Sequence, residues 1–289
     1  MCGFGSFIKH DYLCFMRKIF FILLIITAFT PLKNFAQSRS DYYNLMGQAD
    51  KAAKEGKWAE AEELLREALR MEPDNPSNVL LISNMGMIQF YDGRTDEALS
   101  TLTNALKIAP NSVTILLNRA RVLTAAGRDL SAEEDYNRAI ALDSTLIEPR
   151  FYRAMIALNR GDRQRAIADI DTLVTRHPDD RLTNVAQATI LLQSGQWEEA
   201  IPYLSNAIRQ QPDAAYYASR ALCRIMTNDL SAAADDIALG LELDPIDGEL
   251  YLYRAMLNKL RFRPADAKSD GEKAIQFGID PSRVKALVE

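Results

Sequence analysis

Cysteine and histidine are both scarce in this 289-residue sequence. The chain has three cysteines (Cys2, Cys14 and Cys223), two of them within the first 14 residues, and two histidines, His10 and His177. This inventory excludes a disulfide framework and a zinc site built from cysteine. It also argues against any catalytic or metal centre that needs clustered thiols or imidazoles. We therefore expect no metal and no cofactor.

An excess of positive charge is also missing. The 34 basic residues are outnumbered by 39 acidic ones, which gives a formal net charge of −5. A nucleic-acid-binding protein is therefore not expected, because such proteins carry a basic footprint. Apolar residues make up 48% of the chain and charged residues 25%, which is an ordinary folding composition and excludes wholesale disorder.

A long apolar run occurs once, and it is short for a membrane span. Arg17 and Lys18 precede eleven apolar-rich residues, 19–29. A bilayer span needs about 20 such residues. This pattern is typical of a secretory signal peptide over residues 1–36, with cleavage after Ala36 and a true start at Met16 as a hypothesis. We expect an exported protein, periplasmic or extracellular, with no membrane span after cleavage. An uncleaved signal anchor that tethers the protein to the membrane is the alternative.

The remaining sequence repeats with a period of about 34 residues. Glycines recur at intervals of 37, 34, 34 and 34, and an asparagine takes the same position 33 residues later: Gly56, Gly93, Gly127, Gly161, Gly195 and Asn228. Five residues after each of them stands an alanine, and the column continues once more: Ala61, Ala98, Ala132, Ala166, Ala200, Ala233 and Ala267. A proline column accompanies them: Pro73, Pro110, Pro178, Pro212 and Pro245. Such regular self-similarity is typical of a repeat architecture.

Each period predicts two helices. Apolar residues recur at three- and four-residue spacing before the glycine and again after it. The glycine ends the first helix, where a left-handed backbone favours Gly or Asn. The alanine marks the point where the two helices cross, and the proline ends the second helix.

This pattern resembles tetratricopeptide repeats. One repeat carries the signature as Ala188, Gly195, Trp197, Ala200, Ala207 and Pro212. The resemblance implies an all-α, right-handed superhelical solenoid of about seven helix-turn-helix repeats, continuous and without a domain boundary. The expected segments are a leader at 37–41, repeats at 42–75, 79–112, 113–146, 147–180, 181–213, 214–247 and 248–281, and the start of a capping helix at 282–289. The last repeat, which has Phe262 at the glycine position and Gly271 inside its second helix, should be distorted.

Arginine and aspartate co-vary between repeats at a spacing of 16 residues. The four pairs are Arg119 with Asp135, Arg153 with Asp169, Arg220 with Asp236, and Arg254 with Asp270. The other three repeats lack both members. Because both positions flank the helix crossing, we interpret them as structural ion pairs within a repeat. An arginine row that binds an acidic partner is the alternative.

In the family, first helices line the concave face, and partner segments bind there. By helical phase, the inward residues here would be Leu80, Met87, Phe90, Leu117, Arg121, Phe151, Met155, Leu158, Asn159, Val185, Leu192, Leu222, Met256 and Lys259. This set is mostly apolar and includes several Met and Phe side chains, which suit adaptable recognition. The alternative is that many of them simply pack between repeats.

No catalytic motif stands out, so an enzyme with a small-molecule substrate is not expected. The sequence favours a scaffold of the cell envelope that binds a peptide or protein segment in its concave groove. The alternative is an accessory or stabilising subunit of an envelope enzyme or of secretion or assembly machinery. Such a subunit would use its convex face or its last repeat.

Overall fold

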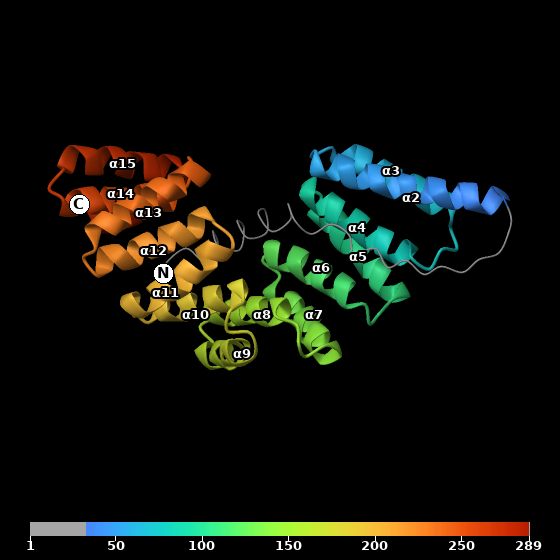
Figure 1. Cartoon of the computed structure of the whole chain (residues 1–289), viewed down its shortest axis with the longest axis horizontal. Helices are drawn as coiled ribbons and strands as arrows, with labels where there is room; N and C mark the ends of the chain where they lie inside the picture. The colour runs from blue at the N-terminus through green and yellow to red at the C-terminus, as the bar shows by residue number, and fades with distance from the viewer. Residues whose placement is uncertain (1–32, 289) are drawn as a thin grey trace. The chain divides into compact units, whose positions relative to one another are not determined.

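The structure, a computed structural model, describes residues 33–288, and within that range it forms α-helices and no strand. The helices are α2 (Lys33–Lys54), α3 (Trp58–Met71), α4 (Asn78–Tyr91), α5 (Thr95–Ile108), α6 (Val113–Ala125), α7 (Asp129–Leu142), α8 (Glu148–Asn159), α9 (Arg163–Arg176), α10 (Arg181–Gln193), α11 (Trp197–Gln210), α12 (Ala214–Met226), α13 (Leu230–Leu243), α14 (Gly248–Leu260), α15 (Pro264–Gln276) and α16 (Pro281–Val288). The expected all-α repeat fold is confirmed (Figure 1). The apolar run and the hypothetical start at Met16 lie outside the described residues.

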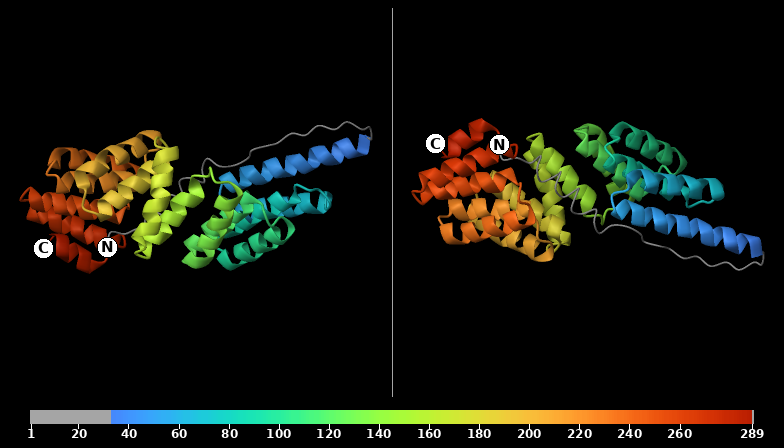
Figure 2. Two further views of the ribbon diagram at one scale, coloured as in Figure 1. Left: turned by 90° about the horizontal axis from the view of Figure 1, so that it is seen from below. Right: turned by 90° about the horizontal axis from the view of Figure 1, so that it is seen from above.

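The helices associate in sequential pairs, each joined by a three-residue turn. Pairs such as α2 with α3 and α14 with α15 pack along their lengths, and the views from below and above show the same pairing (Figure 2). The first helix of the array, α2, begins at Lys33, nine residues before the expected start of the first repeat. The short helix α16 packs against α14 and α15.

Contacts divide the described chain into an N-terminal unit, residues 33–149, and a C-terminal unit, residues 150–288. The sequence analysis expected one undivided array. In a stacked repeat protein each hairpin contacts mainly the hairpins beside it. Few contacts therefore cross any one boundary between adjacent repeats. The division falls in the first turn of α8.

A left-handed residue stands in the middle of each three-residue turn, as the glycine column predicts. Gly127, for example, has φ 70°, and Asn228, the expected substitute, has φ 63°. The amide that follows the left-handed residue donates to a carbonyl five residues back, as Arg128 does to Leu123 at 2.8 Å. This hydrogen bond satisfies a carbonyl at the end of the first helix and sets the angle at which the second begins.

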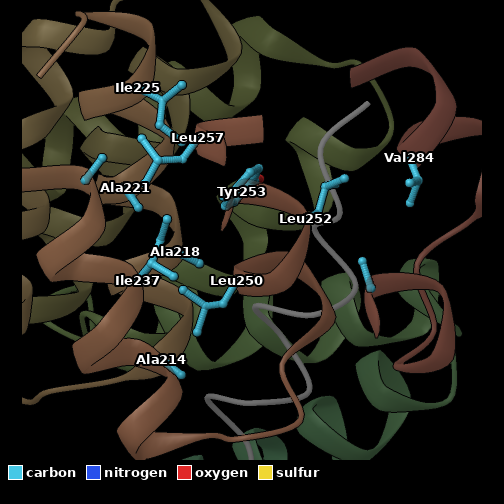
Figure 3. Close-up of a cluster of buried hydrophobic side chains, with 12 residues drawn as sticks. Ala214, Ala218, Ala221, Ile225, Ile237, Leu250, Leu252, Tyr253, Leu257 and Val284 are labelled. Carbon is cyan, nitrogen blue, oxygen red and sulfur yellow. The ribbon is translucent and has the colours of Figure 1, made fainter. Parts of the chain in front are cut away.

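The alanine column lies where the helices of each pair cross. Alanines 61, 98, 132, 166, 200 and 233 have no exposed surface, and Ala267 is also buried. In the C-terminal unit, apolar side chains from successive repeats join in one cluster, in which Ala221 and Ile225 of α12 face Leu257 of α14 (Figure 3). A second cluster in the N-terminal unit is built on Tyr42 of α2 and Leu81 of α4.

The expected distortion of the last repeat is wrong. Helix α14 has the same length of 13 residues as α6, α10 and α12, and α15, also of 13 residues, is one residue shorter than the preceding second helices. Gly271 lies buried in α15, and a Cβ atom built there would stand 3.0 Å from Cγ1 of Val284 in α16. The glycine therefore does not break its helix but lets α16 pack closely against it.

Candidate partner-binding surface

First helices of successive repeats contact one another directly. Such contacts join α4 to α6 in the N-terminal unit, and α12 to α14 and α14 to α16 in the C-terminal unit. Where these contacts are made, the outward residues of neighbouring helices form a strip, and we call the outward side of the first helices the first-helix face. This face is the candidate surface for a partner.

In the N-terminal unit the expected groove residues differ in exposure. Leu80 is 45% exposed, and Phe90 and Leu117 are half-buried, so all three are accessible on the first-helix face. Met87 and Arg121 are buried. Their assignment as contact residues is corrected accordingly.

Arg121 is buried because other side chains already hold its guanidinium. It makes a two-point ion pair with Glu148, at 2.5 Å for both bonds, and donates to the amide oxygen of Asn118 at 2.9 Å. Asn118 in turn donates to the hydroxyl of Ser83 at 3.0 Å. The resulting network links α4, α6 and the start of α8, so Arg121 has a structural role.

In the C-terminal unit, the accessible members of the expected set are Asn159, Leu192, Leu222, Met256 and Lys259. Four others are buried and cannot touch a partner: Phe151, Met155, Leu158 and Val185. Their burial has a simple cause. A single helical hairpin cannot cover its own apolar surface, so these side chains pack within the stack.

Two accessible apolar residues escaped the sequence analysis. Met226 and Leu260 are the last residues of α12 and α14, and each is 46% exposed. Each stands two residues before the left-handed position of its turn, where three of the other repeats carry a polar residue: Lys54, Asn159 and Gln193. An apolar residue at a repeat position that is polar in other repeats could have identified these two residues from the sequence. Together with Leu222 and Met256, they give the first-helix face of α12 and α14 an apolar character. Lys259 adds one positive charge to it.

All four arginine–aspartate pairs are present within ion-pair distance. The shortest separations are 2.7 Å for Arg119–Asp135 and 2.6 Å for Arg153–Asp169, Arg220–Asp236 and Arg254–Asp270. In each pair the Nε and Nη2 atoms of the arginine donate to the two carboxylate oxygens. The aspartates are buried and the arginines are partly exposed. This geometry fits a structural ion pair within each repeat.

Some of these arginines also reach the preceding repeat, which the sequence analysis missed. Nη1 of Arg119 donates to the hydroxyl of Thr103 in α5 at 3.1 Å, and Nη1 of Arg220 donates to that of Ser205 in α11 at 2.9 Å. One guanidinium thus joins three helices. In the sequence, this contact could have been predicted from the hydroxyl residue that lies 15 or 16 positions before the arginine.

A further ionic network joins the first two repeats. Glu62, which is 3% exposed, accepts hydrogen bonds from Arg66 and Arg94, both at 2.5 Å, and from Gln89 at 2.8 Å. Burial by itself raises the pKa of Glu62, but the bonds from Arg94 and Gln89 outweigh it and leave the pKa below its usual value. The Glu62 carboxylate therefore stabilises the contact between α3 and α4 in its charged form.

Metal ligands and a reactive thiol are two features from which a catalytic site could be built. Within residues 33–288, no cluster of three or more His, Cys, Asp or Glu side chains has metal-binding geometry. Burial raises the pKa of the Cys223 thiol to about 12, so it stays protonated at neutral pH. Over the same residues, no helix combines the length and apolar character needed to cross a membrane.

Comparison with known proteins agrees with this architecture. Residues 84–146 and 185–247 match the tetratricopeptide repeat family model. A tetratricopeptide repeat protein from Parabacteroides merdae, known from its crystal structure, superposes with a TM-score of 0.65 at 26% identity, over 86% of this chain and 98% of that one. These two segments are tetratricopeptide repeats, and the described residues have the fold of a tetratricopeptide repeat solenoid.

The curated relatives are much longer proteins. ETO1-like protein 2 of Arabidopsis thaliana is 28% identical over 75% of this chain, and cellulose synthase operon protein C of Pseudomonas fluorescens is 25% identical over 70%. The chain spans only about a fifth of the length of these relatives, 22% and 18% respectively. Their likeness therefore extends to the repeat region alone.

Proposed function

We propose that this protein is a non-enzymatic scaffold that binds a peptide or protein segment on its first-helix face. Tetratricopeptide repeat proteins generally mediate protein–protein interaction, and their fold is typical of non-catalytic scaffolds. The observation that carries the proposal is an apolar strip on two adjacent first helices, in which Met226 and Leu260 are exposed and Leu222 and Met256 are partly buried against the core. Two of these side chains are methionines, whose flexibility lets one surface fit several apolar sequences.

The rigidity of the array supports the same proposal. Ion pairs inside the repeats and their bonds to the preceding helix hold the first helices at fixed spacing. A surface that is ordered before binding leaves most of the ordering cost to the partner. The partner segment would thus dock in an extended or helical form along the strip.

We further propose that the protein acts in the cell envelope after export. The support is the sequence pattern of residues 1–36, with its basic start, its short apolar run and Ala36 before a polar stretch. Fractionation of the producing cell and N-terminal sequencing of the product test it. A product that begins near Gln37 outside the cytoplasm supports cleavage, and an intact N-terminus in the membrane fraction supports the anchor. A cytoplasmic product would overturn the proposal.

The binding proposal is tested by crosslinking in the native cell followed by mass spectrometry. The test variant is Met226→Glu with Met256→Glu, which places two charges on the apolar strip. The matched control is Leu239→Glu with Leu243→Glu, two exposed residues of the second helix α13. Both variants are first checked for native helicity by circular dichroism.

The two candidate functions predict opposite results. A groove scaffold loses its crosslinked partner in the Met226 and Met256 variant and keeps it in the control. An accessory subunit that uses its convex face loses the partner in the control instead. Retention of the partner by a folded strip variant would reject binding at the first-helix face.

A further inference from the structure

The turn of the last repeat holds an unusual residue. Phe262 occupies the left-handed position, with φ 57°, where the six preceding repeats have glycine or asparagine. A bulky residue in this conformation is strained. Its ring is 93% exposed, so burial within the chain does not offset that strain. Backbone strain at an exposed aromatic residue indicates that the residue serves a function, such as binding, and not the stability of the fold.

A second departure lies one helix further on. At the position of Gly271 the six preceding repeats carry large side chains: Leu65, Leu102, Tyr136, Ile170, Leu204 and Ile237. All six are buried. In those repeats this side chain is part of the core. The glycine lacks it, and Val284 of α16, with its Cγ1 3.0 Å from where a Cβ atom would stand, fills part of the space instead.

The result is a surface hollow of about 780 Å³ at the end of the array. Its floor consists of Ala267, Gly271 and Val284, all buried, and Phe262 stands at its rim. Lys259, Lys268 and Glu272 also line it. The hollow lies wholly within the C-terminal unit, between the end of α14, helix α15 and helix α16.

The surroundings of the hollow are basic, unlike the chain as a whole. Residues 259–285 contain seven basic and four acidic side chains, whereas the complete sequence has a net charge of −5. One of the four acids, Asp270, is paired with Arg254 at 2.6 Å. One of the seven bases, Arg283, is paired with Glu249 at 2.5 Å, so the excess of positive charge remains. The two lysines of the hollow are exposed. A ligand that complements this site needs an apolar group for the floor and negative charge for the rim.

We propose that this hollow is a second protein-binding site, which takes an aliphatic or aromatic side chain from an acidic peptide segment, with Phe262 closing over it. The site adjoins the apolar strip of α12 and α14, with which it shares Lys259, but does not depend on the function proposed for that strip. An exposed Phe among basic residues could also insert into an anionic membrane. The concave apolar floor favours the peptide, because a lipid surface would contact the rim and leave the floor empty.

The test measures fluorescence polarisation of a labelled nonapeptide, with a central Leu-Phe pair flanked by Asp and Glu, against the full chain. Two control peptides are used: one with Ser-Ser at the centre, and one with Asn and Gln in place of the acids. The protein variants are Phe262→Gly and Lys268→Glu. Matched controls from the other unit are Leu130→Ala, also an exposed apolar residue, and Lys107→Glu, also an exposed lysine.

We expect saturable binding of the acidic Leu-Phe peptide that weakens at least ten-fold with either control peptide. Phe262→Gly should weaken binding at least ten-fold while raising the melting temperature, since glycine relieves the strain. Lys268→Glu should weaken binding to a similar extent, and the two matched controls should change it less than two-fold. The opposite movement of affinity and stability in Phe262→Gly separates a binding role from a structural one.

Three results would overturn the proposal. The first is no saturable binding of the acidic Leu-Phe peptide up to 1 mM. The second is unchanged affinity in the folded Phe262→Gly variant. The third is Phe262-dependent binding to vesicles of phosphatidylcholine with a quarter phosphatidylglycerol in the absence of peptide binding, which would assign the site to membranes. None of these results bears on the strip of α12 and α14, whose variants leave the hollow intact.

Discussion

Removal of the Arg119 guanidinium should destabilise the protein strongly, because it strands a buried carboxylate. Asp135 is 1% exposed and receives two hydrogen bonds of 2.7 Å from Arg119, which is itself 21% exposed. Loss of one partner from a buried pair costs ~3–5 kcal/mol. Since water reaches part of the guanidinium, we expect about 3 kcal/mol for Arg119→Met, near the lower end of that range. Methionine keeps most of the apolar stem in place.

A sister pair provides the matched comparison. Asp236 is equally buried and binds Arg220 at 2.6 Å, but Arg224 also contacts it at 2.7 Å. In Arg220→Met the carboxylate therefore keeps one cation. We expect this substitution to cost about 1.5–2 kcal/mol, the lower part of the ~1.5–3 kcal/mol that hydrogen bonds to a charged group contribute.

Urea unfolding followed by circular dichroism measures both losses. The cycle is completed with Arg119→Met in combination with Asp135→Leu, which removes both charges and should recover stability to within about 1 kcal/mol of the native protein. Equal losses in Arg119→Met and Arg220→Met would refute the argument that local partners set the cost. A double variant no more stable than Arg119→Met would refute the stranded carboxylate as its cause.

Three further predictions concern other parts of the chain. Phe262→Gly should stabilise the C-terminal unit by about 1 kcal/mol, because a left-handed residue with a Cβ atom carries ~1–2 kcal/mol of strain; a lower urea midpoint would contradict this. Glu62→Gln should lose stability at pH 7, and its difference from the native protein should shrink as the pH falls below the unfolded pKa of about 4.3. The lowered pKa of Glu62 means that its carboxylate stabilises the fold above the unfolded pKa, a contribution lost as pH falls through the folded value; a pH-independent difference in urea midpoint would count against it. Finally, Cys223 should resist iodoacetamide at pH 8 in the folded protein and react rapidly in 6 M guanidinium, as mass spectrometry would show, because burial raises its pKa to about 12.

The sequence alone determined the repeat and its turns. A left-handed backbone is a local requirement that depends on the Cβ atom of one residue, so a column of glycines with one asparagine identifies it. The structure bears this out at Gly127 and Asn228. The 16-residue spacing of Arg119 and Asp135 was equally readable, since it is set by two helices and a turn of constant length.

Tertiary structure alone decided which apolar residues of the first helices are accessible. Phe151 and Met256 obey the same helical periodicity, yet the first is buried and the second is partly exposed. Periodicity marks the apolar side of a helix, but neighbouring repeats on both sides compete to cover it. Arg121 shows the same limit, because the residue that sequesters it, Glu148, lies 27 positions away in the sequence. Local patterns specified the helices, whereas the packing of one repeat on the next set the surface available to a partner.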